Sequence, residues 1–180
     1  MSQSPAQISR LPLALTYPLR FVPLAPLSAS LTLFARKTAR NHPALFRRLG
    51  VHGQKRYVLD PTDLPFVILL DPNGGTPKVT VIRGSGTGAA RIAGPLAALI
   101  GLVHGVYDGD ALFFSRDLVI EGETAATLAL RNAVDDAELD LSQELLNLSG
   151  PLARPLHNMM AFWERHTGVH LTRPDEVETW

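Results

Sequence analysis

Five consecutive apolar residues, Phe66–Leu70, place the strongest constraint on how this chain folds. The turn sequence Asp-Pro-Asn-Gly-Gly at 71–75 ends the run after a length typical of one strand. A strand with one face in water would alternate apolar and polar residues, so this strand must be covered on both faces. The next segment, Lys78–Arg83, does alternate and places Val79 and Val81 on one face. The pattern predicts a sheet covered by helices or by a ligand.

Similar patterns predict short strands and helices along most of the chain. Ser28 or Ser30 is expected to cap the first helix. His42-Pro43 is expected to kink or split it, because the residue before a proline disfavours helical angles. The remaining predicted strands are Arg56–Leu59, Ala90–Ala93 and Leu118–Ile120, and the remaining predicted helices are Pro95–His104, 123–140 and about Pro155–Thr167.

The longest apolar stretch, Leu11–Phe34, is not expected to span a membrane. It contains Arg20 and four prolines, which interrupt the hydrogen-bond ladder that a spanning helix of about 20 residues requires. The same prolines argue against a secretory signal, which needs a continuous apolar core. Residues 1–27 are therefore interpreted as an apolar, proline-rich arm that docks on the protein or touches a bilayer. A domain is expected at 28–145, with a C-terminal amphipathic helix and tail at 146–180.

The net charge of zero conceals a strong asymmetry along the chain. Residues 1–60 contain nine Lys/Arg and one acid, whereas residues 61–180 contain eight Lys/Arg and sixteen Asp/Glu. Zero net charge argues against a nucleic-acid partner. The asymmetry fits either pairing within one fold or a basic face that contacts another protein or an anionic membrane surface. The residues that would make this anion contact are Arg36, Lys37, Arg40, Arg47 and Arg48.

The sequence holds no persuasive catalytic or metal-binding constellation. Cysteine is absent, which excludes disulfides, thiolate ligands and cysteine nucleophiles. His166 and His170 are four residues apart, but no H-E-x-x-H pattern surrounds them. Asp108 and Asp110 are explained more simply as helix caps. We therefore expect no enzyme activity, no cofactor and no metal.

The glycine-rich segment Arg83–Ala89 allows two interpretations. It fits R-x-x-G-x-G, the loop with which acetyltransferases hold the pyrophosphate of an acyl-coenzyme A, because glycines let backbone N–H groups approach phosphate. The alternative is a hairpin turn between two antiparallel strands, in which glycines supply positive φ. The turn is favoured, because Ala90–Ala93 looks extended and the next predicted helix begins only near Pro95.

One segment, Tyr107–Thr124, carries a family resemblance. It contains a Phe, a short turn and the pattern L-x-I-x-G followed by an acid, and it resembles the signature of sterol-carrier-protein-type lipid-binding domains. The form F-x-R-x-L-x-I-E-G is similar to the UbiT-like subgroup, bacterial accessory factors of oxygen-independent ubiquinone biosynthesis. The domain-level similarity covers about residues 40–140. The matching positions are Phe114, Leu118, Ile120, Gly122 and Glu123, where Glu123 replaces the commoner Asp. Arg116 stands where many members of the family have a glycine, and it matches the subgroup form.

This resemblance implies an α+β fold in which a five-stranded, mostly antiparallel sheet packs against helices and an apolar tunnel lies between the layers. It implies a non-catalytic factor that holds polyprenylated quinone precursors for hydroxylases of the UbiU/UbiV type. We expect a cytoplasmic protein that can also lie peripherally at the inner membrane. The residues expected to line the tunnel are Val67, Leu69, Val79, Val81, Leu99, Leu102, Val103, Phe113, Leu118 and Ile120.

Two other functions stay open beside the lipid carrier. One is an acyl-coenzyme A-dependent acetyltransferase that uses Arg83–Ala89. The other is an assembly scaffold whose acidic and basic faces dock partner enzymes. The apolar residues on both faces of the strands also fit an ordinary two-sided core in place of a tunnel.

Overall fold

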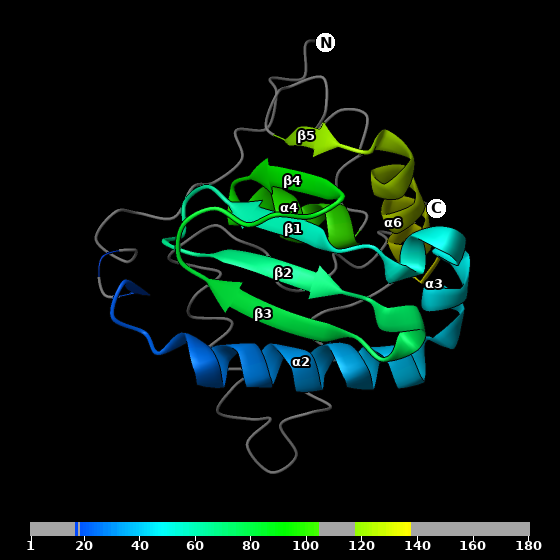
Figure 1. Cartoon of the computed structure of the whole chain (residues 1–180), viewed down its shortest axis with the longest axis horizontal. Helices are drawn as coiled ribbons and strands as arrows, with labels where there is room; N and C mark the ends of the chain where they lie inside the picture. Colours follow the sequence, from blue (N-terminus) through cyan, green and yellow to red (C-terminus); the bar gives the residue numbers. More distant parts are fainter. Residues whose placement is uncertain (1–16, 18, 105–117, 138–180) are drawn as a thin grey trace, which may run out of the picture.

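The computed structural model describes residues 17, 19–104 and 118–137, and the strands in these ranges form one sheet (Figure 1). They are β1 (Tyr57–Pro61), β2 (Val67–Asp71), β3 (Lys78–Ile82), β4 (Ala90–Gly94) and β5 (Val119–Gly122). Their order across the sheet is β3-β2-β1-β4-β5. β1 and β4 run parallel, and every other neighbouring pair is antiparallel. The expected five-stranded, mostly antiparallel sheet is confirmed.

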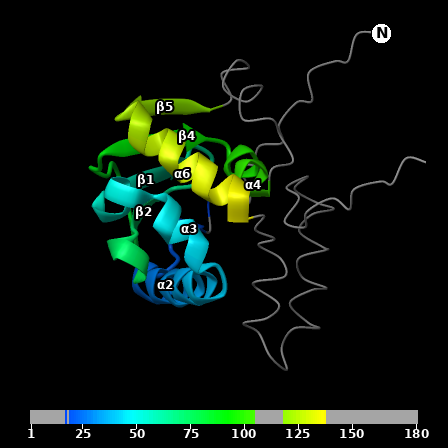
Figure 2. The same ribbon diagram turned by 90° about the vertical axis from the view of Figure 1, so that its right-hand side faces the viewer.

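The main helices of the described ranges gather on one side of this sheet (Figure 2). They are α2 (Leu24–Asn41), α3 (Pro43–Arg48), α4 (Leu96–His104) and α6 (Thr124–Ala137), with short 3-10 turns η1 (Gly50–Gln54) and η2 (Asn73–Gly75). α4 packs on β1 and β4, α6 packs on β4 and α3, and α2 runs along β3. We call the side that carries α4 the back face and the opposite side, which faces the viewer in Figure 1, the front face. The α+β class is confirmed.

The strand register assigns one set of apolar side chains to the back face. Val79 lies opposite Leu70 and Val81 lies opposite Ile68, so these four side chains share a face. Leu70 packs against the core cluster that contains Ala98 of α4, which identifies this face as the back. The predicted placement of Val79 and Val81 on one face is confirmed. The buried core on this side consists of Leu45, Leu49, Tyr57, Ala90, Ile92, Ala98, Leu118, Ala126, Leu130 and Ala133.

The front face carries a smaller apolar cluster surrounded by ion pairs. Val58, Val67 and Leu69 form the cluster, and Ile82 packs against it. The ion pairs nearby join side chains of neighbouring strands across the same face. They are Arg56–Asp71, Arg91–Asp60 and Arg91–Glu121.

Helix α2 begins earlier than the sequence pattern predicts. Its first residue is Leu24, and Pro23 occupies the N-cap position without a side-chain hydrogen bond. The expected cap at Ser28 or Ser30 is therefore wrong, because both serines lie inside the helix. The predicted break at His42-Pro43 is confirmed, since α2 ends at the residue before His42 and α3 begins at Pro43.

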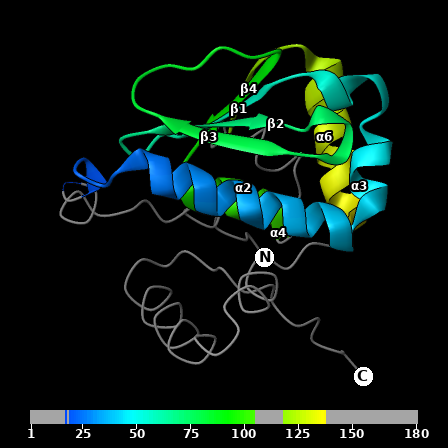
Figure 3. The same ribbon diagram turned by 60° about the horizontal axis from the view of Figure 1, so that its bottom comes forward.

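Two hydroxyl side chains of α2 bind the free edge of β3, along which the helix runs (Figure 3). The Val81 N–H donates to Ser28 Oγ at 2.9 Å, and the Val79 N–H donates to Thr32 Oγ1 at 3.0 Å. Thr32 Oγ1 in turn donates to the Val79 carbonyl at 2.9 Å. Four helical residues rise about 6.0 Å and two strand residues about 6.6 Å, so the two spacings match. The helix thus satisfies an edge that would otherwise be open to another strand.

Residues 83–89 connect β3 to β4 across the front face (Figure 1). The expected hairpin turn is wrong, because β2 and β1 separate β3 from β4, and β4 pairs in parallel with β1. A Cβ at Gly86 would overlap the Leu69 side chain, and a Cβ at Gly88 would overlap the Arg56 carbonyl. The glycines therefore let this connection lie directly on the sheet.

Candidate functional site

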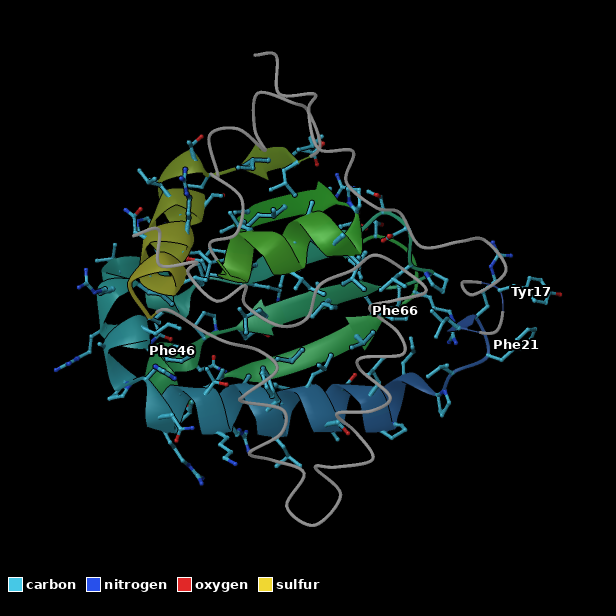
Figure 4. All side chains as sticks on the ribbon, turned by 180° about the vertical axis from the view of Figure 1, so that it is seen from behind. Tyr17, Phe21, Phe46 and Phe66 are labelled. Carbon is cyan, nitrogen blue, oxygen red and sulfur yellow. The ribbon has the colours of Figure 1, made fainter. Side chains whose placement is uncertain are left out.

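The back face carries an apolar strip at the β2–β3 end of the sheet. We define it as Leu59, Ile68, Leu70, Val79 and Val81, which the register places on one face. The two valines are buried, and the other three side chains are half-buried. Seen from behind, the strip's β2 and β3 lie between α4, which covers β1 and β4, and α2, which follows β3 (Figure 4).

One side of α2 borders this strip. Leu24, Leu31 and Thr38 are seven residues apart and therefore share a helix face, with Leu27 and Ala35 between them. We call these five residues the inner stripe. They are half-buried or buried, whereas the solvent-facing residues of α2 lie on the opposite side. Because Ser28 and Thr32 point to the β3 edge and α2 lies behind β3 (Figure 2), the inner stripe faces the space behind the sheet.

Aromatic side chains stand at the two ends of the strip (Figure 4). Phe66 precedes β2 and is buried. Phe46 belongs to α3, at the opposite end, and packs partly buried against the core. The strip, the inner stripe and these two rings together form a surface on which every group is apolar except Thr38.

The residues predicted to line a tunnel do not all share this surface. Val79 and Val81 belong to the strip, and Ile120 lies on the same face through its pairing with Ile92. Val67 and Leu69 lie on the front face, on the opposite side of the sheet.

The other predicted lining residues belong to α4, to the core or to the undescribed part. Leu99 and Leu102 of α4 are half-buried against the core, and Leu118 is buried within it. Val103 lies in α4, but its side chain is outside the part of the chain that the structure describes. Phe113 lies entirely outside that part.

Sequence reasoning missed Ile68 and Leu70, which take the place of Val67 and Leu69 on the back face. All five residues of the run 66–70 are apolar, so the run by itself does not show which of its side chains lie on which face of the sheet. Pairing the run antiparallel with the alternating Val79 and Val81 is the signal that would have found them.

The end of the family motif has an architectural role. Gly122 has φ of 91°, and a Cβ there would overlap the Ala89 carbonyl, so this corner requires glycine. Glu123 accepts from Lys55 Nζ at 2.5 and 2.7 Å, and His52 Nδ1 lies 3.6 Å from it. The Lys55 hydrogen bond holds the pKa of Glu123 below its ordinary value. The motif thus joins the β5–α6 corner to β4 and to the segment before β1.

The predicted anion-contact residues lie on α2 and α3. We call Arg36, Lys37, Arg40, Arg47 and Arg48 the basic face. Four of them are exposed and Lys37 is half-buried, while Arg36 Nε also donates to the Pro77 carbonyl at 3.2 Å. Leu33 of α2 is 63% exposed on the solvent side of the same helix.

An exposed aromatic pair precedes α2. Tyr17 and Phe21 are 63% and 74% exposed, and their ring centroids lie 5.9 Å apart in an edge-to-face contact (Figure 4). Arg83 fastens this segment to the end of β3, because its Nη2 donates to the carbonyls of Arg20 and Val22 at 2.7 and 3.0 Å. The arginine of the R-x-x-G-x-G pattern is therefore bound to backbone oxygens, and β4 follows the glycines without a helix.

Two kinds of site are absent from the described ranges. No helix there is long and apolar enough to cross a bilayer. Within the same ranges, no group of three or more His, Asp or Glu side chains is placed to hold a metal ion.

The fold and the apolar back face define a class of small α+β domains in which helices cover one side of a mixed sheet. Residues 28–135, more than half of the chain, match the SCP-2 sterol transfer family, and the chain belongs to that family. No curated protein is similar enough to match.

One solved structure shows the same fold, and two others are similar over a smaller part of this chain. "UbiJ-SCP2 Ubiquinone synthesis protein" is 18% identical, with a TM-score of 0.52 over 65% of this chain and 96% of that one. Sterol carrier protein domain 2 of Helicoverpa armigera is 14% identical, with a TM-score of 0.46 over 61% and 86%. A conserved hypothetical protein of Thermus thermophilus, possibly a sterol carrier protein by its description, is 17% identical, with a TM-score of 0.43 over 58% and 81%.

Proposed function

We propose that this protein is a non-catalytic carrier that holds the isoprenoid tail of a polyprenylated quinone precursor against the apolar strip, in oxygen-independent ubiquinone biosynthesis. The observation that carries the proposal is the strip itself, bordered by the inner stripe of α2 and by α4. Membership of the SCP-2 sterol transfer family supports the lipid, and the name of the ubiquinone synthesis protein with the same fold supports the pathway. The resemblance of the segment ending at Glu123 supports the oxygen-independent branch.

Hydrophobic burial suffices for such a ligand. Each CH₂ group removed from water contributes about 0.8 kcal/mol, so a few isoprene units are held without any hydrogen bond. The strip follows five-residue strands, which extend about 16 Å, enough for several units. Selectivity for tail chemistry is accordingly expected to be loose.

The basic face is proposed to bring the carrier to an anionic membrane surface. Its cations lie on α2 and α3, close to exposed Leu33, and the exposed pair Tyr17 and Phe21 precedes the same helix. Basic residues near an anionic bilayer contribute about 1 kcal/mol each, and aromatic rings favour the interface. Hydroxylases of the UbiU/UbiV type are proposed to receive the carried precursor, on the basis of the motif resemblance.

The test uses two substitutions of the same residue type on opposite faces. Ile68→Glu places a carboxylate in the strip, and Ile82→Glu places one on the front face, where the side chain is also half-buried. Lipids that co-purify with the full chain are extracted and identified by mass spectrometry. We expect prenylated quinone precursors with the unmodified protein and with Ile82→Glu, and at least about tenfold less with Ile68→Glu.

Circular dichroism of both variants controls for folding. Equal lipid recovery from two folded variants, or recovery of no prenylated lipid from the unmodified protein, contradicts the proposal. Tight coenzyme A binding by the unmodified chain would instead favour the acetyltransferase.

A further inference from the structure

One buried hydroxyl on the apolar surface has no partner. Thr38 is 6% exposed, and its Oγ1 makes no hydrogen bond. A buried polar group without a partner destabilises the folded state, so such groups in folded proteins call for an explanation.

The three other described helix hydroxyls that are buried or half-buried behave differently. Ser28 Oγ donates to the carbonyl four residues earlier at 2.7 Å, and Thr127 Oγ1 approaches the carbonyl four residues earlier at 3.5 Å. Thr32 uses its hydroxyl on the edge of β3. Thr38 alone of these four binds neither its own helix nor the sheet.

The position of Thr38 indicates where its partner would come from. It follows Leu31 by seven residues on the inner stripe, so it faces the space behind the sheet that the strip also faces. It lies in the last turn of α2, at the α3 end where Phe46 stands. The rest of the stripe is apolar, and a hydrocarbon tail offers no hydrogen bond.

We propose that the Thr38 hydroxyl binds the ring hydroxyl of a prenylated phenol, so that the ring lies at the α3 end of the strip and the tail extends along β2 and β3 toward Phe66. This inference rests on the proposed carrier function and adds to it the ligand's orientation and the residue that recognises the ring. Thr38 is a specificity residue and not a catalytic one, because no bond forms or breaks.

The test compares two ligands that differ by one oxygen. Geranylphenol and geranylbenzene share the same tail, and calorimetry with the full-length chain gives the ratio of their dissociation constants. We expect the unmodified protein to prefer geranylphenol about fivefold, Thr38→Val, which has the same shape, to lose this preference, and Thr38→Ser to keep it. Binding of geranylbenzene should be the same in all three proteins.

The outcomes separate this inference from the carrier function. A preference for geranylphenol that survives in Thr38→Val, or its absence from the unmodified protein while both ligands bind, overturns the role of Thr38 and leaves the carrier standing. Failure of both ligands to bind overturns the carrier and this inference with it. If Thr38→Val weakens the binding of cholesterol more than the binding of geranylphenol, the hydroxyl recognises a sterol. That result overturns the proposal that it recognises a phenol.

A stability measurement gives a second readout. Because the Thr38 hydroxyl is unpaired in the ligand-free protein, Thr38→Val should leave the unfolding midpoint unchanged or raise it. A clear fall in that midpoint would show that the hydroxyl already has a protein partner, which overturns the inference.

Discussion

At the scale of single residues, Gly86 shows how a glycine serves close packing. Its backbone lies on the front face, where a Cβ would overlap the Leu69 side chain. We predict that Gly86→Ala lowers the free energy of unfolding by about 1–3 kcal/mol, through forced displacement of the loop or the leucine. Urea denaturation measures the change, with exposed Ser85→Ala as the neighbouring control. Equal stability of the two variants would mean that the loop does not rest on the sheet.

Tyr57 gives the molecule a predicted response to alkali. Burial, with a smaller contribution from Glu123, raises its pKa above the ordinary value near 10, and its hydroxyl donates to the His52 carbonyl at 3.2 Å. Well below pH 10 both states keep the tyrosine proton, so Tyr57 adds no pH dependence to the free energy of unfolding. Above that pH the unfolded state loses the proton first, so the free energy of unfolding falls as pH rises toward the folded pKa.

The measurement is urea denaturation between about pH 8 and 11. Tyr57→Phe should remove part of this alkaline slope and lower stability at neutral pH by about 0.5–1.5 kcal/mol, through loss of the hydrogen bond. Tyr17→Phe, at an exposed ring, should keep the slope. An unchanged slope in Tyr57→Phe would show that other groups cause the loss of stability at alkaline pH.

At the scale of elements, α2 acts as the cover of the β3 edge. Thr32→Val should lower the free energy of unfolding by about 1–3 kcal/mol, because the N–H and carbonyl of Val79 both lose their partner. Ser30→Ala, at an exposed position of the same helix, should stay within about 0.5 kcal/mol. Thermal unfolding gives both values, and size-exclusion chromatography checks whether the opened edge associates. A neutral Thr32→Val would show that packing alone holds α2 in place.

The elements also show what local sequence patterns can predict. The strand predictions agree with the structure to within one or two residues, because turn signals bound the strands and strand length is short. The predicted start of α2 is wrong, since Ser28 has the residue type of a cap but binds a strand distant in sequence. The prediction for the 83–89 connection is wrong for a related reason. Glycines predict a turn, but the strands that it joins depend on the order of the whole sheet.

At the scale of the whole molecule, the sequence identifies an apolar domain of the right class and leaves the geometry of its site undecided. Val79 and Val81 could be assigned to one face because their strand alternates. Ile68 and Leu70 could not, because their strand is apolar on both faces and parity comes only from pairing. Nothing in the sequence marks Thr38, because its proposed role rests on the missing partner of a buried hydroxyl, which only the structure shows.

The concentration of basic residues in the first third of the chain leads us to predict binding to anionic membranes. The basic face on α2 and α3 is expected to bind vesicles that contain anionic phospholipid, more weakly as salt rises, because screening shortens the reach of exposed charges. Arg40→Gln with Arg47→Gln should weaken binding about thirtyfold, from about 1 kcal/mol for each cation. Arg131→Gln on α6 is the control, and it removes one charge outside the basic face. Vesicle co-sedimentation measures binding, with zwitterionic vesicles in parallel. If neither salt nor the paired substitution changes vesicle binding, the membrane contact is made by apolar residues such as Phe21 and Leu33 and not by the basic face.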